Sequence, residues 1–396
     1  MKILQLTKKF PYPMKDGESI AVTNLSKSLS SLGCEITLLS MNTVKHYISK
    51  DSIPTSFDHY KEIHTVDLDN RVTMLGAIRN LLSKDSYHVS RFYFEDFKAK
   101  VVELLKGNQY DIVQLETLYL APYIELIREH SEAKIVMRSH NVEFEIWNRI
   151  AMNTTFLPKK IYIKYLAKKL QNFEIERLSK YDALVTVTER DIEAYRNLGY
   201  NGKGISLPIG INCSEYIADM NTFEKPSISF IGSLDWIPNL EGLNWFIEEV
   251  WQMVIEQNPK VQLFIAGRNT PNSIKVLASE SIIIEGEVED AKAFINDHSI
   301  MIVPLLSGSG MRVKILEGMA LSRVIVSTSI GMEGIDAKDK IEILKADTPE
   351  EFASSLNWIL KNKEKQKRIG TNARKFISTN FDRETNAKNF INFLNA

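Results

Sequence analysis

The sequence predicts an α/β protein built from two doubly wound, Rossmann-like domains that face a central cleft. Three observations lead to this prediction. At 396 residues the chain exceeds what one hydrophobic core usually serves. Short β-branched runs alternate with helical segments, which is typical of parallel sheets covered by helices on both faces. This alternation stops near the middle of the chain and then starts again, so each half supplies its own sheet.

The first half begins with an apolar run at residues 2–6, followed by a helix that Gly33 ends. Together with the next run this is a βαβ unit. We expect the first domain to span residues 1–212. Its expected strands are KILQL, EITLLS, DIVQLE, KIVMRS and ALVTVT.

Residues 210–226 contain prolines and glycine with little periodicity, so we place the hinge there. The second domain then spans residues 213–377. Its expected strands are SISFIG, VQLFIAG, SIIIEGEV, SIMIVPLL and VIVSTS.

Composition narrows the function classes. The formal net charge of -1 argues against a protein that wraps nucleic acid. Cys34 and Cys213 have no metal-type spacing and suit a reducing compartment. The N-terminus is typical of a first strand rather than an export signal, and no window is apolar enough to span a membrane. We therefore expect a cytoplasmic protein.

The stretch SGSGMRVKILEGMA, residues 307–320, follows an expected strand and leads into a helix that we expect to start near Gly310. Ligands of doubly wound sheets bind at strand carboxyl ends, and helix N-termini favour anions. Lys314 and Glu317 would lie on one stripe of this helix. A capped helix with a solvated Lys314–Glu317 pair is an equally good interpretation of this stretch alone. As a phosphate site it would use Gly308, Ser309, Gly310, Met311, Arg312, Lys314 and Glu317.

The stretch FIGSLDWIPNLEGLNWF offers a second backbone site at Gly232 and Ser233. Pro238 is suited to the start of a helix that turns Trp245 and Phe246 inward. For Trp236 we favour packing over stacking on a base.

A third group of polar residues follows the strand KIVMRS. His140 comes directly after this strand and is a candidate for binding or proton transfer. Gly17, before the first helix, is a candidate to bring its amide to an anion, and Arg91 and Tyr87 are candidates for binding in the segment 71–97. The side chains around His140 are Arg138, Asn141, Glu143 and Glu145.

Residues 158–173, PKKIYIKYLAKKLQNF, form a basic, aromatic-rich helix. Such helices can lie on anionic membranes. A solvated helix that packs its apolar side on its own domain is the commoner case, and we favour it.

Taken in order, these motifs resemble family 4-type glycosyltransferases with the GT-B fold over nearly the whole chain. The resemblance is carried by PYPMKDGESIAVTNLSKSLSSLG, MRSHNVEFEIW, LPIGIN, FIGSLDWIPNLEGLNWF, VQLFIAG and SGSGMRVKILEGMALSRVIVSTSIGMEGI. It implies a retaining, metal-independent transfer of sugar from a nucleotide-sugar to a glycan or lipid-linked acceptor of surface polysaccharide or glycolipid synthesis. It also implies that a final helix, residues 378–396, packs back onto the first domain.

Residue by residue, Glu317 matches the second glutamate of the family's Glu-x7-Glu motif, which binds the donor ribose, and Ser309 stands where the first would be. His140 matches the family histidine near the donor sugar. The family's usual Arg and Lys pair is missing from GSLDWIPN, so Arg312 and Lys314, with Arg268 as a weaker candidate, are expected to face the diphosphate. Acceptor-binding candidates are Arg138, Asn141, Glu143 and Arg91.

No metal is expected, because no His or Cys pair has ligand spacing. No cofactor is expected either, and no GxGxxG motif of a dinucleotide-binding enzyme follows the first strand. Contact with the inner membrane face stays open. Two alternatives remain: a nucleotide-sugar epimerase or phosphorylase of the same fold, and a non-catalytic two-lobed binding protein, which normally carries an export signal.

Overall fold

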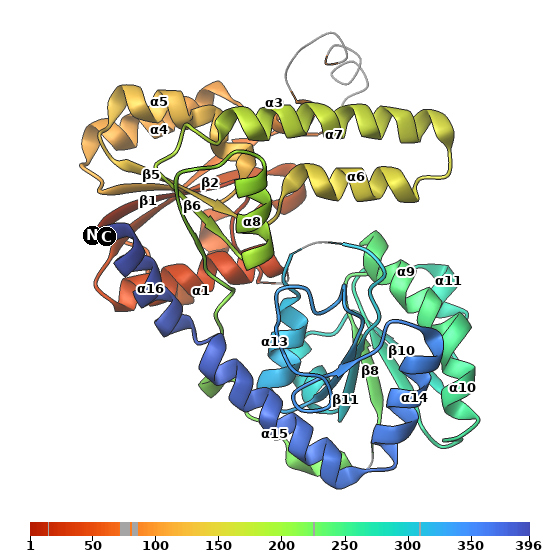
Figure 1. Cartoon of the computed structure of the whole chain (residues 1–396). Helices are drawn as coiled ribbons and strands as arrows, with labels where there is room; N and C mark the ends of the chain where they lie inside the picture. Colours follow the sequence, from red (N-terminus) through yellow and green to blue (C-terminus); the bar gives the residue numbers. More distant parts are fainter. Residues whose placement is uncertain (15, 72–79, 81–85, 225, 309) are drawn as a thin grey trace. The chain divides into compact units, whose positions relative to one another are not determined.

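The computed structural model describes residues 1–396 except 15, 72–79, 81–85, 225 and 309. The described chain divides into two compact units. Unit 1 comprises Met1–Gly210 and Arg383–Ala396, and unit 2 comprises Ile211–Asp382. Each unit is one parallel sheet with helices on both faces (Figure 1). The expected fold class, two Rossmann-like α/β domains, is therefore confirmed.

Unit 1 is built on a seven-stranded sheet in the order β3-β2-β1-β4-β5-β6-β7, and every pair in it is parallel. The strands are β1 (Lys2–Thr7), β2 (Glu35–Thr43), β3 (Glu62–Leu68), β4 (Ile112–Leu115), β5 (Lys134–Ser139), β6 (Ala183–Thr186) and β7 (Lys203–Ser206). Central strand β4 is buried along its whole length because helices cover both faces.

The helices of unit 1 are α1 (Gly17–Ser31), α3 (Tyr87–Ser90), α4 (Glu95–Gly107), α5 (Ile124–His130), α6 (Glu143–Asn153), α7 (Leu157–Arg177), α8 (Glu189–Asn197) and α16 (Arg383–Asn395). Short 3-10 turns are η1 (Val44–His46), η2 (Lys50–Ser52), η3 (Thr55–Phe57) and η4 (Leu118–Tyr123). Gly33 follows α1 at φ +86°, the left-handed conformation that ends a helix.

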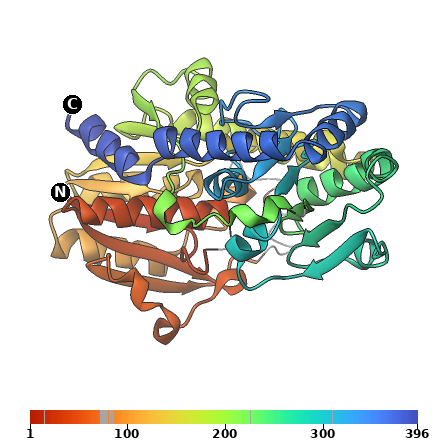
Figure 2. The same cartoon turned by 90° about the horizontal axis from the view of Figure 1, so that it is seen from below.

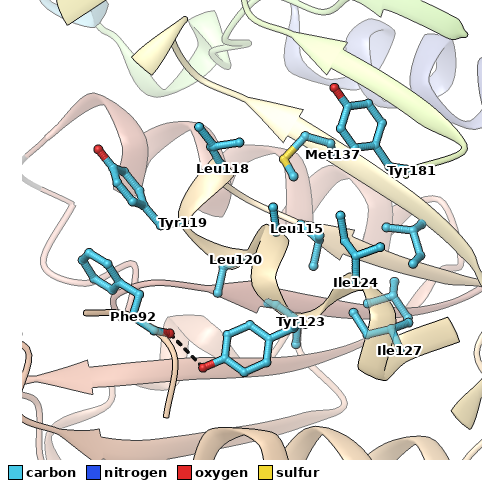
Figure 3. Close-up of a cluster of buried hydrophobic side chains, with 14 of the residues drawn as sticks. Phe92, Leu115, Leu118, Tyr119, Leu120, Tyr123, Ile124, Ile127, Met137 and Tyr181 are labelled. Atoms are coloured by element: carbon cyan, nitrogen blue, oxygen red, sulfur yellow. Dashed lines mark hydrogen bonds between the residues drawn. The ribbon is translucent and has the colours of Figure 1, made fainter. Parts of the chain in front are cut away.

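A large apolar cluster on one face of this sheet fixes the carboxyl ends of β4 and β5 (Figure 3). Leu115 and Met137 project into it from the two strands, and Tyr123 of η4 is fully buried there. The Tyr123 hydroxyl donates a hydrogen bond to the Phe92 carbonyl over 2.8 Å, so its polar group is paired inside the core.

Unit 2 is built on a six-stranded sheet in the order β10-β9-β8-β11-β12-β13, again parallel throughout. The strands are β8 (Ile228–Ile231), β9 (Leu263–Ala266), β10 (Ile282–Gly286), β11 (Ile300–Val303), β12 (Val324–Ser327) and β13 (Leu344–Lys345). Helical segments are η5 (Cys213–Glu215), η6 (Met220–Glu224), α9 (Ile237–Trp245), η7 (Phe246–Val250), α10 (Trp251–Ile255), α11 (Asn272–Lys275), α12 (Ala291–Asn296), α13 (Val313–Ala320), α14 (Pro349–Leu360) and α15 (Lys363–Asn380).

The unit boundaries lie close to the expected ones but differ in detail. Ile211 already belongs to unit 2, because it forms a parallel bridge with Asp382 and its N–H bonds to the Phe381 carbonyl. Helix α15 continues to Asn380 and buries Ile377 in unit 2. The segment that returns to unit 1 is therefore Arg383–Ala396, in which α16 packs against α1. Figure 2 shows both chain ends at one edge of unit 1.

Every strand expected from the sequence is present, and three further strands, β3, β7 and β13, were not expected. Strands β3 and β7 lie at sheet edges and are half exposed, so they lack the continuous apolar run that marks a central strand. Among the described helices, none combines the length and apolar character that crossing a bilayer would require.

Candidate functional site

Each sheet has one position where the order of strands reverses. This switch point lies between β1 and β4 in unit 1 and between β8 and β11 in unit 2. Ligands of doubly wound sheets bind beyond the carboxyl ends of the strands at such points. The segments that leave β1, β8 and β11 carry Gly17, Gly232, Ser233 and residues 308–317, whereas His140 and its neighbours follow β5, the strand next to β4.

In unit 2, the loop after β11 stays irregular until α13 begins at Val313, with Arg312 in the N-cap position. The expectation of a helix from Gly310 was therefore wrong. Gly308 and Gly310 have φ of +113° and +80°, left-handed values that a right-handed helix does not contain. Met311 is buried in this loop, and the Arg312 guanidinium donates to the Gly310 carbonyl. Ser309 lies outside the described residues.

Lys314 projects from α13 to the carboxyl end of β8. Its ammonium donates to the Ile231 carbonyl at 2.9 Å and to Asn239 Oδ1 at 3.0 Å. A Cβ at position 232 would stand 2.9 Å from the Asn239 amide and 3.1 Å from Lys314 Nζ, so only glycine leaves room for this contact. Burial, assisted by the charge of Arg312, lowers the pKa of Lys314 to about 7.

Glu317 lies one turn further along α13. Tyr216, just after η5, donates its hydroxyl to Glu317 Oε1 at 3.2 Å. Burial raises the pKa of Glu317, and the hydrogen bond from Tyr216 opposes this shift. Because Lys314 and Glu317 have different partners, the interpretation of the two as a solvated surface pair is wrong.

The other candidates of unit 2 line neighbouring loops. Gly232 bonds through its N–H to the Ala266 carbonyl, and Ser233 donates to Asp235 at 2.5 Å. Arg268 follows β9 and is partly exposed, and its carbonyl accepts from Leu234 N–H. Helix α9 has Pro238 in its first turn with Trp245 and Phe246 turned inward, as expected. Trp236 is not packed as we favoured, because 47% of it is exposed.

In unit 1, Glu116 is the centre of the corresponding group. It follows β4, is fully buried, and its Oε2 lies 3.1 Å from Arg138 Nη1 and 3.0 Å from His140 Nε2. Gln5 donates to its other oxygen. Burial alone would raise the pKa of Glu116, but the charge of Arg138 and the hydrogen bond from His140 outweigh it and lower the pKa to about 2. A charged carboxylate thus fixes the His140 ring.

Arg138 has a different place from the one the sequence suggested. It is 2% exposed and bonds to Glu116 and to the Ala21 carbonyl. This burial argues against direct contact with an acceptor. We assign Arg138 instead to holding Glu116 in position.

The loop after β1 and the start of α1 add charges next to His140. Asp16 caps α1, accepting from Ser19 N–H, so Gly17 is the first helical residue. Lys8 lies 3.1 Å from Glu18 and 4.6 Å from the centre of the Tyr119 ring. Burial works to raise the pKa of Glu18, but Lys8 and Lys9 outweigh it and hold the pKa below its usual range.

Glu143 completes this group from the start of α6. It accepts from the Tyr119 hydroxyl at 2.8 Å, and burial raises its pKa. Hydrogen bonds of Ser139 hold the loop before Glu143 in place. The Ser139 hydroxyl donates to the Asn141 carbonyl at 2.7 Å, and its oxygen lies 2.8 Å from the Tyr195 hydroxyl. Tyr195 also donates to Glu174, whose carboxyl accepts weakly, at 3.4 Å, from the N–H groups of Glu143 and Phe144.

Two further candidates are Glu145 and Arg91. Glu145 contacts Arg149 and Arg190 on the surface of unit 1. Arg91 is partly buried with its guanidinium 5.2 Å from the Phe92 ring centre. Residues 72–79 and 81–85 of the segment 71–97 lie outside the described residues.

Several members of both groups escaped the sequence reasoning. Glu116 and Lys8 directly follow β4 and β1, so the rule that placed His140 would also have found them. No local signal marks the others, because tertiary packing alone brings them to the site. These are Tyr216, Asn239, Tyr119, Glu174 and Tyr195.

Within the described ranges, no three His, Cys, Asp or Glu side chains gather as ligands for a metal. Metal independence stays a prediction.

We next compared the chain with protein families and with known proteins. The family model of glycosyl transferases group 1 matches residues 225–362, all within unit 2. Residues 225–362 therefore resemble a group 1 glycosyltransferase domain.

Similar proteins span the whole chain. An uncharacterized 44.6 kDa protein in a cps region of Klebsiella pneumoniae is 27% identical, over 96% of both chains. Among solved structures, HepE of Anabaena in complex with UDP is 12% identical with a TM-score of 0.68, over 100% of both chains. Sucrose-phosphate synthase of Thermosynechococcus elongatus is 15% identical with a TM-score of 0.72, over 99% of this chain and 98% of that one. The GT-B fold that the sequence motifs led us to expect is thus confirmed.

Proposed function

We propose that this protein is a retaining glycosyltransferase that moves a sugar from a nucleotide-sugar to a glycan or lipid-linked acceptor of surface polysaccharide or glycolipid synthesis. One observation carries the proposal. Lys314 and Glu317 stand on one side of α13, close to the switch point of the unit that the family model matches, and each is held by a neutral partner. Among the described residues Lys314 has no anionic hydrogen-bond partner, and a diphosphate would supply one. Ribose hydroxyls would donate to Glu317.

The chemistry that we propose is electrostatic. Negative charge builds up on the leaving diphosphate as the glycosidic bond breaks. Lys314, Arg312 and the N–H groups at the start of α13 stabilise that charge more in the transition state than in the bound donor. The acceptor hydroxyl attacks from the face that the diphosphate leaves and passes its proton to the departing phosphate oxygen, so the new bond replaces the broken one with the anomeric configuration retained. No step requires a metal.

Unit 1 is proposed to bind the acceptor, with Asn141, Glu143 and Arg91 as candidate contacts. His140 positions the sugar and supports the transition state. Its Nε2 faces the ionised Glu116, so this nitrogen carries the proton and Nδ1 stays available as an acceptor when the ring is neutral.

Similar proteins support these assignments. HepE of Anabaena was solved in complex with UDP and with UDP-glucose, which supports a nucleotide-sugar donor for this chain. The place of the Klebsiella relative in a cps region supports a role in building polysaccharide. A lipid-linked acceptor would bring the protein to the inner face of a membrane, and we include that contact in the proposal.

Thermal unfolding with a panel of UDP- and GDP-sugars tests the donor assignment. A ligand at about a hundred times its Kd stabilises a protein by about 2.7 kcal/mol, which raises the midpoint by several degrees. The wild-type protein should be protected by at least one donor, and Glu317→Gln should lose most of that protection.

Glu280→Gln, at an exposed glutamate of the same unit, is the matched control and should behave as wild type. If no donor protects the wild-type protein, the proposal fails. If donor is isomerised when no acceptor is present, the epimerase alternative is correct instead.

A further inference from the structure

The outer face of α7 carries large apolar side chains that are exposed. The inner face packs on unit 1 through Ile163, Leu166 and Leu170. On the opposite side Leu157 is 64%, Ile161 60% and Tyr165 40% exposed. These three residues are spaced four apart, so they form one ridge along the helix.

The ridge continues around the turn between α6 and α7. Met152 and Phe156 are each 66% exposed there. Figure 1 shows α6 and α7 side by side as a hairpin within unit 1. We call the exposed residues Met152, Phe156, Leu157, Ile161 and Tyr165 the hairpin ridge. A monomeric protein rarely leaves so many large apolar side chains together in water.

Positive charge surrounds this ridge. Residues 146–173 contain six basic residues and no acidic one, although the whole chain has a net charge of -1. Lys164 and Lys168 are exposed on the same side of α7 as Ile161, since residues three and seven apart share a helix face. The six are Arg149, Lys159, Lys160, Lys164, Lys168 and Lys169.

We propose that the hairpin ridge of α6 and α7 docks on an anionic phospholipid membrane, its apolar side chains entering the headgroup region and its lysines facing lipid phosphates. This inference rests on the proposed function in one respect, since it names the surface through which a lipid-linked acceptor would be reached. Apolar and basic groups on one helix face suit an anionic lipid surface, whereas a neutral protein groove would leave the lysines without partners. The packed inner face agrees with the interpretation that we favoured from the sequence, and the exposed outer face leaves a surface for the membrane contact proposed here.

Co-sedimentation with lipid vesicles tests this proposal without any sugar substrate. The full-length protein should bind vesicles of equimolar phosphatidylglycerol and phosphatidylcholine and should not bind pure phosphatidylcholine. Binding should fall when salt is raised to about 1 M, where the Debye length is only about 3 Å.

Two double variants separate the contribution of positive charge to vesicle binding from that of apolar side chains. Lys164→Gln with Lys168→Gln should weaken binding about thirtyfold, because each lysine near an anionic surface contributes about a factor of five. Leu157→Ser with Ile161→Ser should weaken it at least about tenfold through lost apolar burial.

Matched controls come from unit 2 and α16. Ile217 and Val276 are 82% and 77% exposed, and their replacement by Ser should leave vesicle binding unchanged. Lys275→Gln with Lys388→Gln, at two exposed lysines, is the charge control. Equal binding to neutral and anionic vesicles, or equal losses in ridge and control variants, would overturn the proposal.

The donor-protection measurement keeps the two proposals apart. Hairpin variants that lose vesicle binding should keep full protection by nucleotide-sugar. If vesicles bind but no donor protects, the membrane surface stands and the catalytic proposal fails. If a donor protects but anionic vesicles do not bind, only the membrane proposal fails.

Discussion

The buried charged groups at the two switch points differ in the kind of partner they have. In unit 1 the buried carboxylate of Glu116 contacts two basic side chains, and its pKa falls to about 2. In unit 2 Lys314 and Glu317 have, among the described residues, only uncharged hydrogen-bond partners, and their pKa values move toward the neutral forms.

This difference indicates which of the two regions gains from binding a charged ligand. A group whose charges are already matched is preorganised and needs no ligand to complete it. A lysine whose charge is held back by burial gains most from an incoming anion. The comparison therefore favours unit 2 as the place where the diphosphate binds and unit 1 as a fixed platform.

The largest expected effect concerns the matched charges of unit 1. Glu116→Gln should lower the free energy of unfolding by about 3–5 kcal/mol, because it leaves the buried Arg138 without its counter-charge. Denaturant unfolding measures this. Glu35→Gln, which breaks the exposed pair with Lys61, should leave the free energy of unfolding nearly unchanged, because solvent screens an exposed ion pair. Similar losses in both variants would show that Glu116 is not the centre of a buried charge network.

The next effect concerns the unmatched lysine of unit 2. Lys314→Met should weaken donor binding about thirtyfold, because a hydrogen bond to a charged group contributes up to about 2 kcal/mol. Its stability should stay equal to wild type or rise, since the buried ammonium is replaced by an apolar chain. Titration calorimetry with the best donor measures affinity, and Lys275→Met is the control. If donor affinity is unchanged in Lys314→Met, Lys314 does not contact the donor.

The same lysine predicts a pH dependence for donor binding. With a pKa of about 7, Lys314 loses its proton above neutral pH, so donor affinity should fall by up to about tenfold per pH unit from there. The folded pKa lies below the ordinary value of 10.5, so the unfolded chain binds more protons between these values, and this group makes stability rise with pH across that window. In Lys314→Met both slopes should flatten.

A smaller effect is expected at Tyr216. Tyr216→Phe removes the hydrogen bond that orients Glu317 and should weaken donor binding about fivefold, in line with about 1 kcal/mol for such a bond. The variant should keep the overall fold, because only the hydroxyl is lost. An affinity loss as large as that of Glu317→Gln would mean that Tyr216 itself contacts the donor.

The smallest effect on stability at neutral pH is expected at Glu174, which accepts hydrogen bonds from the start of α6. Burial raises the pKa of Glu174 to about 8, against the hydrogen bond from Tyr195. The folded state thus binds more protons than the unfolded chain between the ordinary value of 4.5 and about 8, so this group makes stability fall as pH rises through that window. At pH 6 Glu174→Gln should differ from wild type by less than about 1 kcal/mol.

At pH 9 the Glu174→Gln variant should be the more stable of the two, because only the wild-type carboxyl then carries a buried charge. Unfolding curves at the two pH values measure the difference. A variant that is equally destabilised at both would contradict the raised pKa.

Central strands and the order of motifs could be predicted because they depend on local patterns. A buried parallel strand is a continuous apolar run in the sequence. The residues that follow it lie at the carboxyl end of the sheet, where ligands of this fold bind. The edge strands β3 and β7 were missed because half exposure interrupts that pattern. The start of α13 was misplaced because the sequence does not state which φ a glycine adopts, and here Gly308 and Gly310 are left-handed.

By itself the sequence determined the two α/β domains, the group 1 resemblance, and the positions of His140, Lys314 and Glu317 in the chain. Only the tertiary structure decided their partners, because those partners come from distant segments that packing alone brings within bonding distance. Asn239, Tyr216 and Glu116 are such partners. The fold likewise decided that Arg138 supports the site from a buried position and that α7 leaves one apolar face exposed.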